Sequence, residues 1–436
     1  MTTTTTPELD FGDAAQLDAS RSALARRLAG STILRIAGQV RAMIVAGRPI
    51  CNLTVGDFDS RQFPIPQPLL EGTRDALTGG ETNYPPSNGV LALRHALIEY
   101  LEREQGVRYP LESVIVTSGG RPVVYAAFRA VVDADDTVLY TVPSWNNDHY
   151  ANMVGARTIE LPGNRDDGFQ PTVEQLQPHL GSVRLLCLCT PSNPTGTVLP
   201  TARLREIMEA VVEENARRRK AGERFLFVLF DQMYGSLVFP PAEHANPLAI
   251  VPGSAPYVIA LDGVSKAFAA TGLRVGWAMA APPIAKTMSD FLGHVGTWAP
   301  RPEQVATARF LADADAVETF RHTFRAGIKA RLDRLYEGFQ SLRGDGYPVD
   351  CISPRGAIYL SLQLDLIGRS IDGSPIATNE DIRQLLLEHA GLAVVPFQAF
   401  GLPGDTGWFR ASVGAVSPRD IEDALPRVRA LLDRVR

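Results

Sequence analysis

The middle of the chain alternates short apolar runs with helical segments, and this alternation constrains the fold more than any other feature. The apolar runs lie at residues 113–117, 137–141, 183–189, 225–230 and 257–261, and each ends at a turn signal or a polar residue. Strands that alternate with helices form parallel β-α-β units. We therefore predict an α/β fold for this part of the chain.

The pattern changes after about residue 320. A long helical stretch at 321–342 is followed by strand-like runs at 356–362, 392–396 and 408–413 and by helices at 379–390 and 418–434. This mixture is typical of a smaller α+β domain, which we expect an N-terminal segment to complete. The predicted parts are an N-terminal tail or arm at 1–30, the N-terminal segment of the small domain at 31–60, the large domain at 61–320, and the C-terminal part of the small domain at 321–436.

Composition excludes several classes of protein. The formal net charge of −5 over 436 residues argues against a nucleic-acid-binding face, which needs clustered basic charge. The basic run at 217–220 closes an amphipathic helix and is interpreted as a solvated helix end. No apolar window is long enough to span a membrane, and the threonine-rich start is not a signal peptide. The four cysteines suit a reduced, cytoplasmic protein, with Cys187 and Cys189 as core residues and no metal site.

Polar clusters follow the predicted strands at their carboxyl ends, where open parallel sheets bind ligands. The most informative cluster contains Lys266 just after the run at 257–261, with Ser265 beside it and Arg274 eight residues later. A serine hydroxyl and a guanidinium are suitable donors to a phosphate. Burial and nearby positive charge lower the pKa of a lysine and leave it free to act as nucleophile and base. This grouping predicts an amine bonded to an aldehyde beside a bound phosphate.

Other strand ends carry further candidates. Gly119, Gly120 and Arg121 precede a predicted helix, where backbone N–H groups and the helix dipole favour a phosphate. Asn193 begins an Asn-Pro-Thr-Gly turn and presents a free side-chain amide. On general grounds a carboxylate at the position of Asp231 is usually a turn cap, and a tryptophan at the position of Trp145 is usually a core residue.

Residues 265–277 resemble the Schiff-base signature of the class I/II aminotransferases, which are pyridoxal-phosphate enzymes of fold type I. The resemblance extends over about residues 52–410, with the motifs in family order. It implies a mainly parallel sheet of the seven-stranded type between helices in the large domain. It also implies pyridoxal 5'-phosphate as cofactor, Lys266 as the Schiff-base lysine, and a homodimer with shared active sites.

The resemblance assigns roles to single residues. Asp231 pairs with the pyridine nitrogen, Asn193 and Tyr234 bond the phenolic oxygen, and Trp145 stacks on the ring. Gly119, Gly120, Arg121, Ser265 and Arg274 surround the phosphate, and Tyr84 reaches the phosphate of the neighbouring subunit. The substrate residues are Arg410 for the α-carboxylate, Asn193, and Gly56 in the pocket wall. Asp57 and Asp59 are interpreted mainly as loop caps. Arg301 lies near the region of the second, partner-supplied arginine of dicarboxylate-specific relatives and is interpreted mainly as a solvated residue.

The predicted function is transfer of an amino group between an L-amino acid and a 2-oxo acid. Two alternatives stay open at this point. One is a different pyridoxal-phosphate reaction, such as β- or γ-elimination, cyclisation or oxidation, because all share the same early carbanion. The other is a non-catalytic, cofactor-binding regulator, although the residues before position 52 are too few and too weakly basic for a DNA-binding module.

Overall fold

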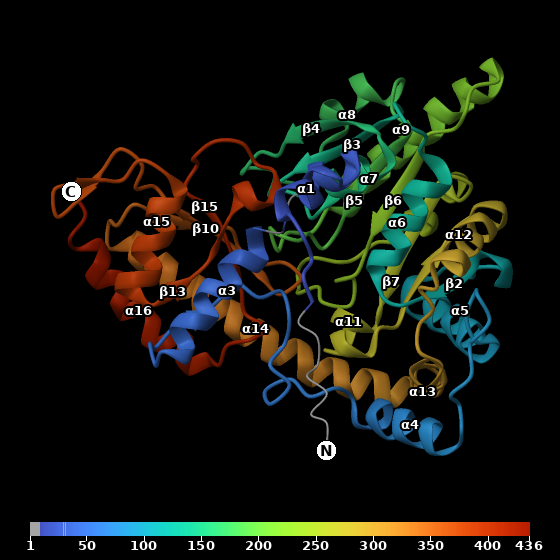
Figure 1. Ribbon diagram of the computed structural model, residues 1–436, viewed down its shortest axis with the longest axis horizontal. Helices are drawn as coiled ribbons and strands as arrows, with labels where there is room; N and C mark the ends of the chain where they lie inside the picture. The colour runs from blue at the N-terminus through green and yellow to red at the C-terminus, as the bar shows by residue number, and fades with distance from the viewer. Residues whose placement is uncertain (1–8, 29, 31) are drawn as a thin grey trace.

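A large, mainly parallel sheet and a smaller antiparallel sheet organise the protein. The structure is a computed structural model that describes residues 9–28, 30 and 32–436. In Figure 1 the large sheet lies on the right and the small sheet on the left, and the long helix α14 (Ala314–Gly344) runs along the lower side of the view from the left half towards α13. The α/β fold with a mostly parallel sheet of seven strands is confirmed.

The large sheet is parallel except at one strand. Its strands, in spatial order, are β2 (Val114–Thr117), β8 (Gly276–Met279), β7 (Val258–Gly263), β6 (Phe227–Asp231), β5 (Leu185–Cys189), β3 (Thr137–Val142) and β4 (Arg157–Pro162). The exception is β8, which pairs antiparallel with both of its neighbours. The carboxyl ends of the parallel strands therefore share one edge, where the polar clusters of the sequence lie.

Helices cover both faces of this sheet because side chains alternate between the faces along each strand. One face packs against α6 (Gly120–Val131), α7 (Asn147–Val154) and α12 (Pro282–Val295). The opposite face packs against α5 (Leu91–Gln105), α8 (Val173–Leu180), α9 (Thr201–Ala221) and α13 (Arg301–Ala312). The other helices of this part of the chain are α4 (Gln67–Thr78), α10 (Pro247–Ile250) and α11 (Val264–Ala267).

Two strands of the large sheet were absent from the sequence prediction. The edge strand β4 exposes much of its surface, so it carries no continuous apolar run. The strand β8 follows directly on the segment that contains Lys266. Its first residues belong to the motif at 265–277, which was interpreted as a functional segment and not as a strand. Helix α14 also begins earlier than predicted, at Ala314 instead of residue 321, because the side chain of Asp313 caps it by accepting from the Ala316 N–H at 2.9 Å.

The small sheet is antiparallel and joins distant parts of the chain. Its strands, in spatial order, are β14 (Val395–Pro396), β15 (Trp408–Ser412), β10 (Tyr359–Leu364) and β9 (Val349–Cys351). Separate two-stranded pairs are β1 (Cys51–Asn52) with β13 (Leu392–Ala393), and β11 (Ser370–Ile371) with β12 (Ser374–Pro375). The flanking helices are α3 (Thr32–Val45), α15 (Asn379–Leu385) and α16 (Pro418–Leu432). Parallel pairing of β1 with β13 attaches the N-terminal segment to the C-terminal part.

Two short helices, α1 (Ala14–Ala19) and α2 (Ala23–Arg27), occur in the predicted N-terminal tail or arm. Each has a side-chain cap at its start, Asp13 for α1 and Ser22 for α2. The threonines at the start of the chain lie outside the described residues. Within the described ranges, every helix is too short or too polar to cross a bilayer.

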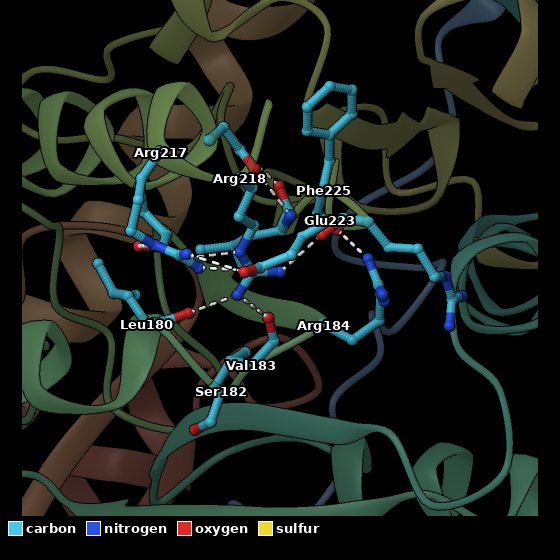
Figure 2. A network of polar contacts seen from close by, with 12 residues as sticks. Leu180, Ser182, Val183, Arg184, Arg217, Arg218, Glu223 and Phe225 are labelled. Atoms are coloured by element: carbon cyan, nitrogen blue, oxygen red, sulfur yellow. Dashed lines mark hydrogen bonds and ion pairs between the residues drawn. The ribbon is translucent and has the colours of Figure 1, made fainter. Parts of the chain in front are cut away.

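The basic run at the end of α9 forms a network of polar contacts, which Figure 2 shows. Arg217 is exposed, as predicted for a solvated helix end, and pairs with Glu214 and Glu223. Arg218 is buried instead, and its guanidinium donates to the carbonyls of Leu180 and Val183 at 2.7 and 2.8 Å. The prediction of full solvation is wrong for Arg218, because its charge satisfies carbonyls at the end of α8.

Candidate active site

Lys266 lies in α11, a single helical turn that starts where β7 ends. Its Nζ donates to the carbonyl of Gly56 and lies 5.5 Å from the centre of the Phe58 ring. Burial lowers the pKa of Lys266 to about 8, and the guanidinium of Arg410 contributes in the same direction. The amine is therefore much less basic than an exposed lysine.

The start of α6 and the guanidinium of Arg274 form the candidate phosphate site. Arg274 donates to the carbonyls of Ser118 and Thr271 at 3.0 and 2.6 Å. Gly119 has a φ of 94°, and a Cβ at this position would lie 2.3 Å from Nη2 of Arg274. Only glycine allows this approach. The fold therefore brings the Ser118-Gly119-Gly120 turn and the Lys266–Arg274 segment together.

Asp231 and Trp145 line one small hollow at the carboxyl ends of β6 and β3. One carboxylate oxygen of Asp231 accepts from the Met233 N–H at 3.0 Å, and burial raises the pKa of Asp231 to about 6. The guanidinium of Arg121 lies 5.0 Å from the centre of the Trp145 ring, within the range of a cation–π contact. The hollow thus contains a buried carboxylate. A positively charged partner would stabilise its ionised form, because burial alone disfavours that form.

Arg410 lies in β15 with only 2% of its surface exposed. It donates to Asn193 Oδ1 at 3.1 Å and to the carbonyl of Thr54 at 2.7 Å. Its Nε has no partner among the described residues, and burial lowers its pKa. No carboxylate forms an ion pair with it within the described ranges. A buried guanidinium of this kind is suited to an incoming carboxylate.

Tyr359 is a site residue that sequence reasoning missed. It lies in β10, its hydroxyl bonds that of Tyr234, and its ring centre is 4.8 Å from the Arg410 guanidinium. A Cβ at position 56 would lie 2.8 Å from the Tyr359 hydroxyl, so glycine at this position allows the close approach of Tyr359. The only sequence signal was a tyrosine within a predicted apolar strand. Phe400, whose ring centre is also 4.8 Å from Arg410, gave no sequence signal at all.

Some predicted residues lie elsewhere or have other partners. Tyr84 is 83% exposed and packs edge-on against Trp298, with 5.3 Å between ring centres. Arg301 is an ion-pair partner of Glu81. The carboxylate of Asp57 accepts from the hydroxyl of Thr271 at 2.7 Å, which ties the Gly56 loop to the Lys266 segment. Asp59 pairs with Arg61, two residues further on, and caps its own loop.

Comparison with known proteins identifies the family. The family model described as "Aminotransferase class I and II" matches residues 48–428. A bifunctional aspartate aminotransferase and glutamate/aspartate-prephenate aminotransferase of Petunia hybrida is 31% identical, over 96% of this chain and 84% of that protein. An aspartate aminotransferase of Streptomyces avermitilis is 29% identical, over 95% and 97% of the two chains.

Solved structures agree with this comparison. The crystal structure of the aspartate aminotransferase from Rhizobium meliloti matches with a TM-score of 0.85 and 27% identity, over 95% of this chain and 99% of that one. The aspartate aminotransferase from Thermus thermophilus with maleate matches with a TM-score of 0.84 and 27% identity, over 94% and 99%. Because the family match spans most of the sequence, the chain belongs to the class I and II aminotransferases, enzymes of the pyridoxal-phosphate fold type I family.

Proposed function

We propose that this enzyme transfers an amino group between an L-amino acid and a 2-oxo acid, with Lys266 as the amine that bonds the aldehyde of pyridoxal 5'-phosphate. One observation carries the proposal. Lys266 and Arg410 hold the same loop, through the carbonyls of Gly56 and Thr54 respectively. A weakly basic amine thus lies close to a buried arginine that has no carboxylate partner, which is the pair of groups an α-amino acid requires.

The chemistry of the donor set fits the cofactor. The candidate phosphate donors are Arg274, Ser265 and the N–H groups at the start of α6. Asp231 would hold the pyridine nitrogen, Trp145 would stack on the ring, and Asn193 and Tyr234 would bond its phenolic oxygen. When bound, pyridoxal phosphate supplies an aldehyde that condenses with amines and a ring that accepts electrons.

The protein's own groups would then bind, orient and move protons. Arg410 binds the α-carboxylate of the substrate through two N–H groups, which fixes the position of the α-carbon. Neutral Lys266 removes the proton from that carbon, because its lowered pKa leaves Nζ partly unprotonated near neutral pH. The rings of Phe58 and Tyr359 line this space and help to exclude water.

We also propose a homodimeric assembly, a division into two domains, and a cytoplasmic location. A homodimer would use the exposed Tyr84 to complete the partner's phosphate site. We place the large domain at 61–320 and the small domain at 31–60 with 321–436. A buried cluster that combines Cys51 and Leu53 with many residues of 324–432 supports joining these two segments in one domain, and it also contacts the large domain through Phe63, Tyr234, Leu237, Phe239 and Ala269. The four cysteines are free thiols, which agrees with a reducing cytoplasm.

The decisive experiment compares wild-type enzyme with Lys266→Ala. Wild-type holoenzyme, mixed with single amino acids and no oxo acid, should convert its cofactor to the amine form, which is followed by absorbance. Lys266→Ala should lower kcat by about 10³-fold or more, because general-base catalysis is lost. The control Lys286→Ala removes an exposed lysine that pairs with Asp290 on the same helix and should retain wild-type activity. Turnover retained in Lys266→Ala, or release of ammonia without the amine form, would contradict transamination.

A further inference from the structure

A second cavity lies at the carboxyl end of β7, on the face of the large sheet that α5 covers. Its volume is about 450 Å³, within the range of roughly 300–1,000 Å³ typical of small-molecule sites. Its walls come from α5, the loop after β6, the end of β7 and the first turns of α14. It shares no lining residue with the hollow between Trp145 and Asp231.

Arg321 brings a buried guanidinium edge to this cavity. The residue is 7% exposed, and its Nη1 is held by Glu104 and Glu318 at 2.5 and 3.1 Å. Its Nε and Nη2 are buried and have no partner within the described part of the chain. These two neighbouring N–H groups match the two oxygens of a carboxylate. The hydroxyl of Tyr100, which also lines the cavity, interacts with this guanidinium as well. Carboxylates therefore hold Nη1, whereas Nε and Nη2 have no carboxylate partner within the described residues.

Two more polar atoms in the cavity wall have no described partner, namely Ser236 Oγ and His244 Nδ1. Gln232 uses its Nε2 to donate to Gln105 at 3.3 Å, so its carbonyl oxygen is the atom that lies 2.9 Å from His244 Nε2. His244 therefore donates through Nε2. Burial lowers the pKa of His244 to about 4, so the ring is neutral and Nδ1 is an acceptor.

The charges around the cavity nearly cancel. Arg321 and Arg325 are positive, and Glu104 and Glu243 are negative. Glu318, which pairs with Arg321, adds one further negative charge beside the lining. Burial raises the pKa of the third carboxyl group in the lining, that of Asp262, to about 8, so this carboxyl is mostly uncharged at neutral pH. Balanced walls do not favour a phosphate dianion. A small carboxylate that also has a hydrogen-bond donor fits both the guanidinium edge that lacks a carboxylate partner and the imidazole acceptor.

We propose that this cavity is a second binding site, separate from that of Lys266, for a small 2-hydroxy or 2-amino acid. The carboxylate binds Nε and Nη2 of Arg321, and the hydroxyl or ammonium group donates to His244 Nδ1. Ser236 Oγ donates to a remaining carboxylate lone pair.

The test uses [1-¹³C]glycolate as probe and ¹³C NMR as readout. The titration uses cofactor-loaded Arg410→Met enzyme, because Arg410 would otherwise bind the same probe. One saturable site is expected in this background. Adding Arg321→Met should weaken binding about tenfold or more, and adding Ser236→Ala about threefold. Acetate, which lacks the donor, should bind at least about threefold more weakly than glycolate.

The matched control is Arg334→Met, which removes an arginine of the same helix that pairs with Glu422 at 2.9 Å. It should leave glycolate binding unchanged. The proposal fails if no saturable site is found, or if Arg321→Met and Arg334→Met have equal affinities. Equal affinities for glycolate and acetate, or tighter binding of inorganic phosphate, would also contradict it. Should Arg321→Met lose its folded circular-dichroism spectrum, the Ser236→Ala and acetate titrations decide the matter.

Discussion

At the scale of single residues, Lys266 is an amine that the fold holds at a cost in stability. Its pKa of about 8 in the folded protein lies below the ordinary value of 10.5. Between pH 8 and 10.5 the unfolded chain therefore binds more protons at this position than the folded chain does. The free energy of unfolding therefore rises with pH over that interval. Below pH 8 the burial of Lys266 lowers it by the full amount.

We therefore predict that Lys266→Met stabilises the cofactor-free protein at pH 7. The expected gain is about 3 kcal/mol, because lowering a pKa from 10.5 to about 8 corresponds to a free-energy difference of roughly that size. The advantage over wild type should shrink as the pH rises from 8 to 10.5. Urea unfolding of both proteins at several pH values measures this difference. The control Lys286→Met, at an exposed position, should stay within about 0.5 kcal/mol of wild type. Equal stability of Lys266→Met and wild type at pH 7 would show that Lys266 is not strained by burial.

At the scale of elements, the start of α6 depends on one glycine. Gly119 combines a φ of 94° with close contact to Arg274. Gly80 also has a positive φ, 81°, but a Cβ there would meet nothing within 4 Å. Substitution of Gly80 tests the effect of backbone strain alone, whereas substitution of Gly119 tests backbone strain together with crowding at the candidate phosphate site.

Gly119→Ala should lose both stability and cofactor affinity. The left-handed backbone costs about 1 kcal/mol or more for a residue with a Cβ. The displaced guanidinium of Arg274 should weaken pyridoxal-phosphate binding by about tenfold or more. Gly80→Ala should show a similar loss of stability with unchanged affinity. Thermal unfolding and equilibrium dialysis of the cofactor measure the two effects. Unchanged affinity for the cofactor in Gly119→Ala would contradict the placement of the phosphate site at the start of α6.

At the scale of the whole molecule, the exposed Tyr84 predicts a shared active site. In a hybrid of a Lys266→Ala subunit with a Tyr84→Phe subunit, a shared arrangement places both changes in one site and leaves the other intact. The intact site should bind pyridoxal phosphate with wild-type affinity. The Tyr84→Phe homodimer should bind it about tenfold more weakly. Sedimentation and cofactor titration of the purified hybrid test this. A hybrid whose surviving site binds like the Tyr84→Phe homodimer would show that each tyrosine serves its own subunit.

Two strands of the large sheet, β4 and β8, were not predicted because their residues alone do not show a strand pattern. The edge strand β4 has no neighbour on one side and so needs no continuous apolar run. The strand β8 has only four residues and lies between β2 and β7, so its identity depends on the neighbours that it pairs with.

The sequence by itself determined the alternating α/β order and the identity of the Lys266 segment. Both depend on local patterns: apolar runs with their turns, and a lysine with Ser265 beside it and Arg274 nearby. Only the tertiary structure decided what surrounds Arg410, because Thr54, Asn193, Tyr359 and Phe400 come from four separate segments. It likewise decided that Arg301 pairs with Glu81 and that Arg321 faces a cavity. A periodic pattern reports the preference of neighbouring residues, whereas contacts between distant segments depend on how whole elements pack.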